Sequence, residues 1–259
     1  MISGRAITAL FGLIVPLAAK AQPAKPLVTL PLSQYGSLSA LKLQAKDLQG
    51  PVRKNVDAAI AVAAEASTKA LEAEAVMQAA ERAARTGHEN LKLSFDHCRY
   101  RGEIANGRAS GLGVMVCASG GFKGRFRDGR LDGLGGDYSS KTADAYEGAY
   151  ENGQRMDLGV ERDGDGFYPG RYGFYVDPKD PSRRVDMELL GTQDFRGSHW
   201  AGTYGSYAGP KIACTLIKGA VLEGSVLDGP GAKFDAGGKV TEQGLYNVGI
   251  LKNGAGPPC

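Results

Sequence analysis

The chain has 259 residues, of which 38 are Gly, a share well above the usual value of about 7%. Its 31 Lys and Arg residues against 28 Asp and Glu residues give a formal net charge of +3. A nearly neutral chain has no general electrostatic attraction to nucleic acid or anionic lipid, so we expect no nucleic-acid partner. The Gly residues are concentrated after residue 87. Because Gly disfavours helices, that part is predicted to form short strands and tight turns.

Residues 1–21 have the three-part layout of a secretory signal peptide. Arg5 is the positive charge, residues 6–19 are a short apolar run, and Ala19-Lys20-Ala21 is a small-x-small cleavage site before Gln22. The apolar run is shorter than the roughly 20 residues that a membrane-spanning helix needs. We therefore expect an exported protein, periplasmic or extracellular, with an uncleaved anchor as the alternative.

The cysteines fit an exported protein, because their number is even in an oxidising compartment. All four follow the predicted cleavage site: Cys98, Cys117, Cys214 and Cys259. Cys98 and Cys117 flank a predicted turn at Asn106-Gly107, which would place them on adjacent strands and leave Cys214 to pair with Cys259. Free thiols, or an interchain bridge through Cys259, are the alternative. No C-x-x-C spacing occurs and the three His are scattered, so we expect no metal site.

The region before the Gly-rich part divides into a linker and a helix. Residues 22–51 are predicted to be a Pro-containing linker. Residues 22–36, with Pro23, Pro26 and Pro31, are expected to be extended, and a short helical turn is expected from Leu38 to Leu48. Residues 52–87 are predicted to form one long helix, because residues 52–86 contain thirteen Ala and neither Gly nor Pro. Gly87 is a suitable C-terminal stop.

One side of this helix has apolar residues at steps of four and three, the spacing of a coiled coil. The seam is Val52, Val56, Ala59, Ala63, Ala66, Ala70, Ala73, Met77, Ala80 and Ala84. Ala side chains allow close approach but bury little surface. Three arrangements fit this pattern: a coiled coil that sets an oligomeric state, packing of the helix along a sheet, and a solvated spacer.

Residues 95–254 repeat at intervals of roughly 20–24 residues, as in a solenoid or array. Tyr100-Arg-Gly102-Glu-Ile104 is followed by Asn106-Gly107 and by Gly111-Leu-Gly113. The same offsets recur in units led by Phe122 and Tyr146. Weaker units are led by Tyr168, Trp200, Leu222 and Glu242, with an irregular insertion at 178–190 and a short tail at 255–259.

Each unit is predicted to be a β-hairpin. Asn-Gly and Asp-Gly favour the type I′ turn, which needs positive φ at both central residues. A single hairpin cannot bury its own apolar face, so neighbouring hairpins must associate. We therefore predict a mainly β fold: tandem antiparallel hairpins in a single extended twisted sheet of about fourteen strands, preceded by one long Ala-rich α-helix.

The pattern aromatic-x-Gly-x-aromatic, Asn/Asp-Gly and Gly-x-Gly resembles the MORN (membrane occupation and recognition nexus) repeat over residues 100–254. The resemblance implies an elongated hairpin array that acts as a scaffold, dimerises, or binds lipid head groups or protein segments. It implies no catalysis. The sequence also lacks phosphate-loop, dinucleotide and hydrolase motifs, so we expect no catalytic residues and no cofactor. Asp163-Gly-Asp165-Gly166 is interpreted as turn chemistry and not as a calcium loop.

The aromatic rings of the repeats are the candidate binding residues for a ligand or a partner. They are Tyr146, Tyr150, Tyr168, Tyr172, Trp200 and Tyr204. The alternative is that these rings mainly hold neighbouring hairpins together. A basic set, Arg125, Arg127 and Arg130, is interpreted as a solvated face because acidic residues lie between its members.

Two functional hypotheses follow. The first is an exported, non-enzymatic scaffold or protein-binding module, which also includes self-association. The second is a ligand-binding module that recognises cell-wall glycan or phospholipid head groups through the aromatic sheet face.

Overall fold

The computed structural model describes residues 48, 50–87, 90–93, 95–142, 144–163, 166–176, 184–195, 198–207, 224–235, 237–247 and 250–252. The predicted signal peptide, most of the predicted linker, Cys214, Cys259 and the tail at 255–259 lie outside these residues. None of the helices that the structure describes has both the length and the apolar character needed to cross a membrane.

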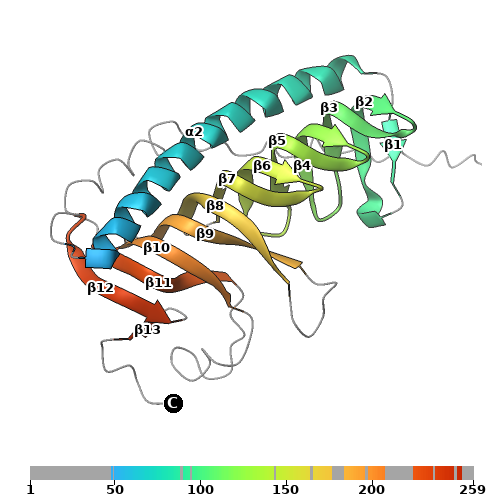
Figure 1. The fold of residues 1–259 in the computed structure, drawn as a ribbon. Helices are drawn as coiled ribbons and strands as arrows, with labels where there is room; N and C mark the ends of the chain where they lie inside the picture. Colours follow the sequence, from blue (N-terminus) through green and yellow to red (C-terminus); the bar gives the residue numbers. More distant parts are fainter. Residues whose placement is uncertain are drawn as a thin grey trace, which may run out of the picture.

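The described chain is one α-helix, a short 3-10 helix and a sheet whose strands follow the sequence order (Figure 1). The helices are α2 (Gly50–Thr86) and η3 (Phe95–His97). The strands are β1 (Asn90–Lys92), β2 (Arg99–Ala105), β3 (Arg108–Val116), β4 (Gly120–Arg127), β5 (Arg130–Ser139), β6 (Ala145–Glu151), β7 (Gln154–Arg162), β8 (Gly166–Val176), β9 (Arg184–Phe195), β10 (Ser198–Tyr207), β11 (Gly224–Phe234), β12 (Val240–Asn247) and β13 (Ile250–Leu251).

All neighbouring strands pair antiparallel in a single thirteen-stranded sheet. The predicted fold class, hairpins in one extended sheet after a long helix, is therefore confirmed. The turns form as the sequence predicts. Asn106-Gly107 has φ values of 51° and 71°, and Asn152-Gly153 has 51° and 82°. These are the positive φ values that a type I′ turn requires.

A line of glycines crosses the sheet from β2 to β12, one on each strand and each paired with the next. This glycine row is Gly102, Gly113, Gly124, Gly135, Gly148, Gly159, Gly170, Gly191, Gly202, Gly231 and Gly244. Tyrosine rings lie against it: a Cβ at Gly113 would collide with the Tyr100 ring, and one at Gly159 with the Tyr146 ring. The glycines are thus required by close packing of rings on the backbone.

α2 lies along one face of the sheet and contacts every strand from β2 to β12 (Figure 1). Nine of the ten predicted seam residues are buried, and Val52 is partly buried. At the first turn of the helix, the Asn55 side-chain amide donates to Thr203 Oγ1 at 2.9 Å and to the Pro230 carbonyl oxygen. Of the three arrangements left open by the sequence, the structure has the packing of the helix on its own sheet. A coiled coil through the same seam would have to displace that sheet.

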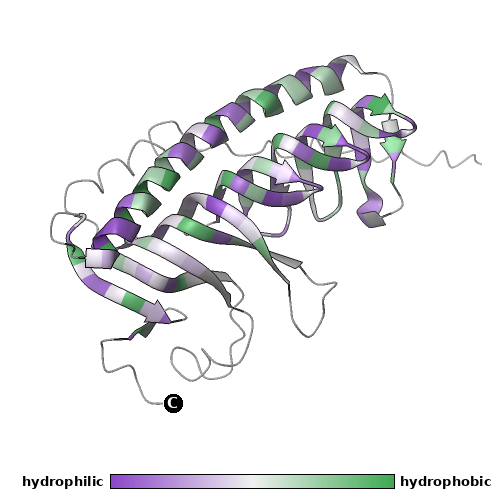
Figure 2. Cartoon of the chain, viewed as in Figure 1, coloured by the Kyte–Doolittle hydropathy of each residue, from purple (hydrophilic) through white to green (hydrophobic). Residues whose placement is uncertain are grey.

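The helix is amphipathic along its whole length. Apolar and polar segments alternate on α2 and on the hairpins, so no continuous apolar block is formed (Figure 2). The outer side of α2 carries ion pairs such as Lys69–Glu72, at 2.7 Å. The small seam residues therefore face the sheet and the charged residues face solvent, which is the distribution expected for a helix covering one side of a sheet.

Two boundaries differ from the prediction. The helix begins at Gly50, so Gly50 and Pro51 are part of it, and Leu48 is buried in the core beside Val56 and Phe234 instead of being in a linker. The predicted insertion at 178–190 contains the start of β9, which pairs with β8 from Arg184 onward. The sequence pattern missed β9 because this hairpin lacks the Asn-Gly or Asp-Gly turn.

Candidate functional site: the open face of the sheet

The two faces of the sheet differ in what covers them. The Lys123 side chain of β4 points to the face of the sheet that α2 covers, and its ammonium pairs with Glu81 of the helix. We call this the helix face. Because successive side chains alternate across a strand, Phe122 and Phe126 point to the other side, which we call the open face. Asp137 and Tyr146 lie opposite each other on neighbouring strands. Gly136 faces Met77 of the helix, so the next residue, Asp137, points to the open face, and Tyr146 points there with it.

On the open face, each hairpin places an outgoing-strand residue opposite one return-strand residue. These five cross-strand pairs are Ile104–Ala109, Phe126–Leu131, Tyr150–Arg155, Tyr172–Glu188 and Tyr204–Leu227. All five follow a register shift at or near the glycine row. The pairs form the packed interior of the array, and we refer to their second members as the return-strand position.

The predicted binding aromatics divide into two groups. Four are core residues, with exposed fractions of 0% for Tyr146, 5% for Tyr150, 2% for Tyr172 and 3% for Tyr204. Tyr146 meets Tyr150 and Tyr172 edge-to-face, with ring centroids 5.3 and 4.9 Å apart. Burial raises the pKa of these tyrosines well above the usual value. They hold neighbouring hairpins together and offer little surface to a ligand.

The other two predicted aromatics, Tyr168 and Trp200, are only partly buried. The Tyr168 hydroxyl donates to Asp163 Oδ2 at 2.9 Å, across the connection between β7 and β8. The Asp163 side chain also accepts from the Gly166 N–H at 2.8 Å, consistent with turn chemistry. A binding role for Tyr168 and Trp200 therefore stays a prediction that their exposure permits.

Trp200 belongs to a group in which a cation lies between two rings. The Lys233 ammonium is 5.4 Å from the centroid of Trp200 and 5.3 Å from that of Tyr246. It also pairs with Glu242 at 2.9 Å, and Glu242 accepts from the Tyr246 hydroxyl at 2.8 Å. Burial would raise the pKa of Glu242, but these two hydrogen bonds lower it. The group therefore favours the charged form of Glu242 next to Lys233 and the Trp200 ring.

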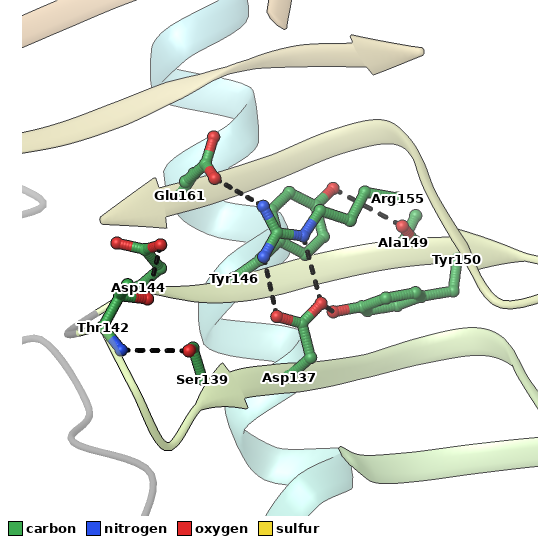
Figure 3. Close-up of polar contacts among 9 residues, drawn as sticks. All are labelled: Asp137, Ser139, Thr142, Asp144, Tyr146, Ala149, Tyr150, Arg155 and Glu161. Carbon is green, nitrogen blue, oxygen red and sulfur yellow. Dashed lines mark hydrogen bonds and ion pairs between the residues drawn. The ribbon is translucent and has the colours of Figure 1, made fainter. Parts of the chain in front are cut away.

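A polar cluster of the open face is centred on Arg155 of β7 (Figure 3). The Arg155 guanidinium donates to both oxygens of Asp137, at 3.0 and 2.7 Å, and to Glu161. The Tyr150 hydroxyl donates to Asp137 at 2.7 Å. The guanidinium also lies over the Tyr146 ring, 5.1 Å from its centroid. One cation is thus held by two carboxylates and one ring, and a second tyrosine hydroxyl holds one of the carboxylates.

The electrostatics of this cluster follow from its burial. Burial alone would lower the pKa of Arg155, but Asp137 and Glu161 together raise it well above its usual value. Burial raises the pKa of Glu161, although Arg155 opposes the shift. Because the bidentate geometry uses the donors of Arg155 within the protein, the cluster is arranged to hold β5, β6 and β7 together and not to perform chemistry.

Two cavities open beside the hairpins. One, of about 300 Å³, lies next to the Arg155 cluster and is lined in part by Phe122, Tyr138 and Asp186. The other, of about 410 Å³, lies between two hairpin turns and is lined in part by Arg108 and Arg130. Of the predicted basic set, Arg125 and Arg130 are exposed, and Arg127 pairs with Asp132, so the set does not form one site.

The first strands are fastened by a disulfide between Cys98 and Cys117. Beside it, Asp96 accepts hydrogen bonds from the N–H and the hydroxyl of Ser119, and these bonds lower its pKa. The predicted cross-strand bridge is therefore present. Asp96 and the two sulfurs lie close together, but because both sulfurs are in the bridge they are not available as thiolate ligands for a metal.

With this geometry described, the comparison with known families is informative. Three segments match the MORN repeat. They are residues 100–122, 122–135 and 146–167. These MORN segments correspond to β2–β7 and the first residues of β8, while β8–β12 continue the same glycine row without a match. A search of curated proteins found no match.

Sequence reasoning missed three polar residues of the open face: Arg155, Glu188 and Gln193. Glu188 is 1% exposed and accepts a 2.9 Å hydrogen bond from the Gln193 side chain. The aromatic pattern gave the outgoing strands correctly, but it ignored the residues opposite the rings. Counting four residues back from each second glycine would have found Arg155, as it finds Leu131 and Leu227.

Proposed function

We propose that the chain is an exported, non-enzymatic scaffold or protein-binding module that presents the open face of its sheet to a protein partner. MORN repeats are consistent with a protein- or membrane-binding module, and they are generally non-enzymatic. The observation that carries the proposal is the continuous sheet with one face closed by α2. The helix does not cover the opposite face, which presents the partly exposed Tyr168 and Trp200 beside its packed ring core.

The open face offers anchors rather than a reaction centre. Its ionic groups are engaged with one another, as in the bidentate Arg155–Asp137 contact. Partly exposed rings, Tyr168 and Trp200, lie outside the core ladder. Partly buried aromatic anchors set among fixed polar groups are typical of protein-binding surfaces. Export rests on the signal-peptide pattern at residues 1–21 and is part of this proposal.

The rival hypothesis, recognition of a glycan or phospholipid head group, has less surface available than the sequence suggested. Four of its six proposed aromatic residues are buried to 5% exposure or less. What favours it is the Trp200 group, because a partly exposed indole beside Lys233 and Glu242 can contact a sugar face. We keep it as the second candidate and let the test separate the two.

The test is quantitative co-purification of the full chain from the cell-envelope fraction of its host. We compare wild type, the open-face variant Tyr168→Ala/Trp200→Ala, and a control, Gln78→Ala, on the exposed side of α2. The expected result is one protein at fixed stoichiometry with wild type and control, and its loss with the open-face variant. Recovery of the chain from the cytosolic fraction would contradict export.

The same proteins are then titrated with glycan fragments and with vesicles of anionic phospholipid. Saturable binding that is lost in the Trp200 variant, without a stoichiometric protein partner, would overturn the scaffold proposal in favour of the rival.

A further inference from the structure

Glu188 is a buried carboxyl group at a position where other hairpins place an apolar side chain. The return-strand position is Leu131 in β5 and Leu227 in β11, which are 3% and 0% exposed. In β9 it is Glu188, 1% exposed. Its carboxylate lies over the paired glycines Gly170 and Gly191, where an added Cβ would collide with it. The repeat thus places an ionisable group inside its core.

The surroundings of Glu188 come from four strands. Tyr172 of β8 is its cross-strand partner, and Gln193 of its own strand donates to it at 2.9 Å. Tyr204 of β10 and Glu161 of β7 also interact electrostatically with Glu188, and Tyr146 and Arg155 act on the neighbouring Tyr172. The hydroxyls of Tyr172 and Tyr204 donate to main-chain oxygens of Tyr168 and Trp200. Those two hydroxyls are therefore directed to the backbone.

A carboxylate is costly to bury, and the direction of the effect is clear here. Burial raises the pKa of Glu188 well above its usual value of 4.5, the Gln193 hydrogen bond lowers it, and the charge of Glu161 raises it. The folded form therefore holds a proton that the unfolded form releases. The contribution to stability is fully present below pH 4.5 and is lost as the pH rises through the folded-state pKa.

We propose that ionisation of Glu188 loosens the β8–β10 segment, so that this part of the sheet opens with rising pH while β3–β5 stays closed. This segment connects the MORN-matched strands β2–β7 to the Trp200 group on β10–β12. Opening there separates two parts of the open face that are otherwise one rigid surface. The inference goes beyond the proposed function and holds whatever partner binds.

The test is hydrogen exchange of the full chain, read by peptide mass spectrometry between pH 5 and pH 8 and corrected for the intrinsic pH dependence of exchange. In wild type, we expect protection in peptides of β8, β9 and β10 to fall by up to tenfold per pH unit, the linkage limit for one proton. Peptides of β3–β5 are the internal reference and should not change. In Glu188→Gln, which has no proton to lose, protection in β8–β10 should be independent of pH.

Two further variants make the result decisive. Glu188→Leu copies the residue found at 131 and 227 and should also abolish the pH dependence, even where Gln at this site impairs folding. Glu151→Gln removes an exposed carboxyl on β6, so the protection of β8–β10 should change with pH as it does in wild type. The proposal is wrong if Glu188→Gln and Glu188→Leu both keep the wild-type pH dependence of protection in β8–β10. It is also wrong if wild-type β3–β5 loses protection together with β8–β10.

Discussion

The β6–β7 and β8–β9 hairpins in the middle of the array and the hairpins on either side of them solve the same packing problem with different chemistry. In the β4–β5 and β10–β11 hairpins, an aromatic ring faces a buried leucine, as in Phe126–Leu131 and Tyr204–Leu227. In the β6–β7 and β8–β9 hairpins, a tyrosine faces Arg155 or Glu188. The paired ring lies two positions after the glycine row in all four, and its partner lies four positions before the row in three of them and three positions before it in β8–β9. The repeat therefore specifies shape through glycines and rings, while the return-strand position tolerates a charge wherever partners are supplied.

The largest effect is expected from removing the guanidinium of the central cluster. Arg155→Ala leaves the partly buried carboxylates of Asp137 and Glu161 without their cation, and the free energy of unfolding should fall by about 3–5 kcal/mol. Arg171→Ala on the next strand is the matched control, because its side chain is 48% exposed in a pair with Asp157. Arg171→Ala should lower the free energy of unfolding by less than about 0.5 kcal/mol. Urea denaturation measures both, and equal losses would show that the Arg155 cluster is solvated.

An apolar return-strand position should be sensitive to volume. Leu227 is fully buried, so Leu227→Ala leaves a cavity and should lower the free energy of unfolding by about 3 kcal/mol. Leu245, at 43% exposure, provides the comparison, and Leu245→Ala should cost under about 1 kcal/mol. If the two variants unfold at the same denaturant concentration, β10 and β11 do not share a packed core.

The glycine row should be intolerant of a methyl group wherever a ring lies on it. Gly159→Ala places a Cβ against the Tyr146 ring and should cost about 2 kcal/mol through overpacking. Gly107 in the first turn has open space around it, so Gly107→Ala should cost only the strain of its positive φ, about 1 kcal/mol. Thermal unfolding distinguishes the pair, and a reversed order would contradict the ring-on-glycine packing.

The smallest effect concerns the pH dependence of overall stability. Above pH 4.5 the unfolded chain ionises Glu188 and the folded chain does not, so stability should fall by about 1.4 kcal/mol per pH unit up to the folded-state pKa. Subtracting the profile of Glu188→Leu, measured by urea denaturation at each pH, isolates this contribution. A difference, wild type minus variant, that increases as the pH rises would have the wrong sign.

Much of this architecture could be predicted because it depends on local rules. Asn-Gly turns, alternation around Gly102 and the Ala-rich run at 52–86 each specify one element, and the first two repeat often enough to define the array. The partner of the helix could not be predicted, because an Ala seam fits a second helix and a flat sheet equally well. The small residues that accept the helix, such as Gly136, Ala201 and Ala232, are brought to one face only by the strand register.

The candidate site was less predictable for a related reason. Ring spacing identified Tyr146 and Tyr172 but not their burial, which depends on the bend and register of the adjacent hairpin. Arg155 is one of many arginines in the sequence, and its partners Asp137 and Glu161 lie on neighbouring strands. Such a cluster becomes visible only when the strands are placed side by side.

The length of α2 has a consequence for how such a protein can change size. At 1.5 Å per residue its 37 residues span about 55 Å, and the eleven strands β2–β12 at about 4.8 Å spacing span about 48 Å. One more hairpin would widen the sheet by about 9.6 Å, close to the 10.5 Å rise of seven helical residues. Gain or loss of a repeat therefore has to be matched by a seven-residue change in the helix, which also preserves the phase of its alanines. Repeat number and helix length are expected to change together.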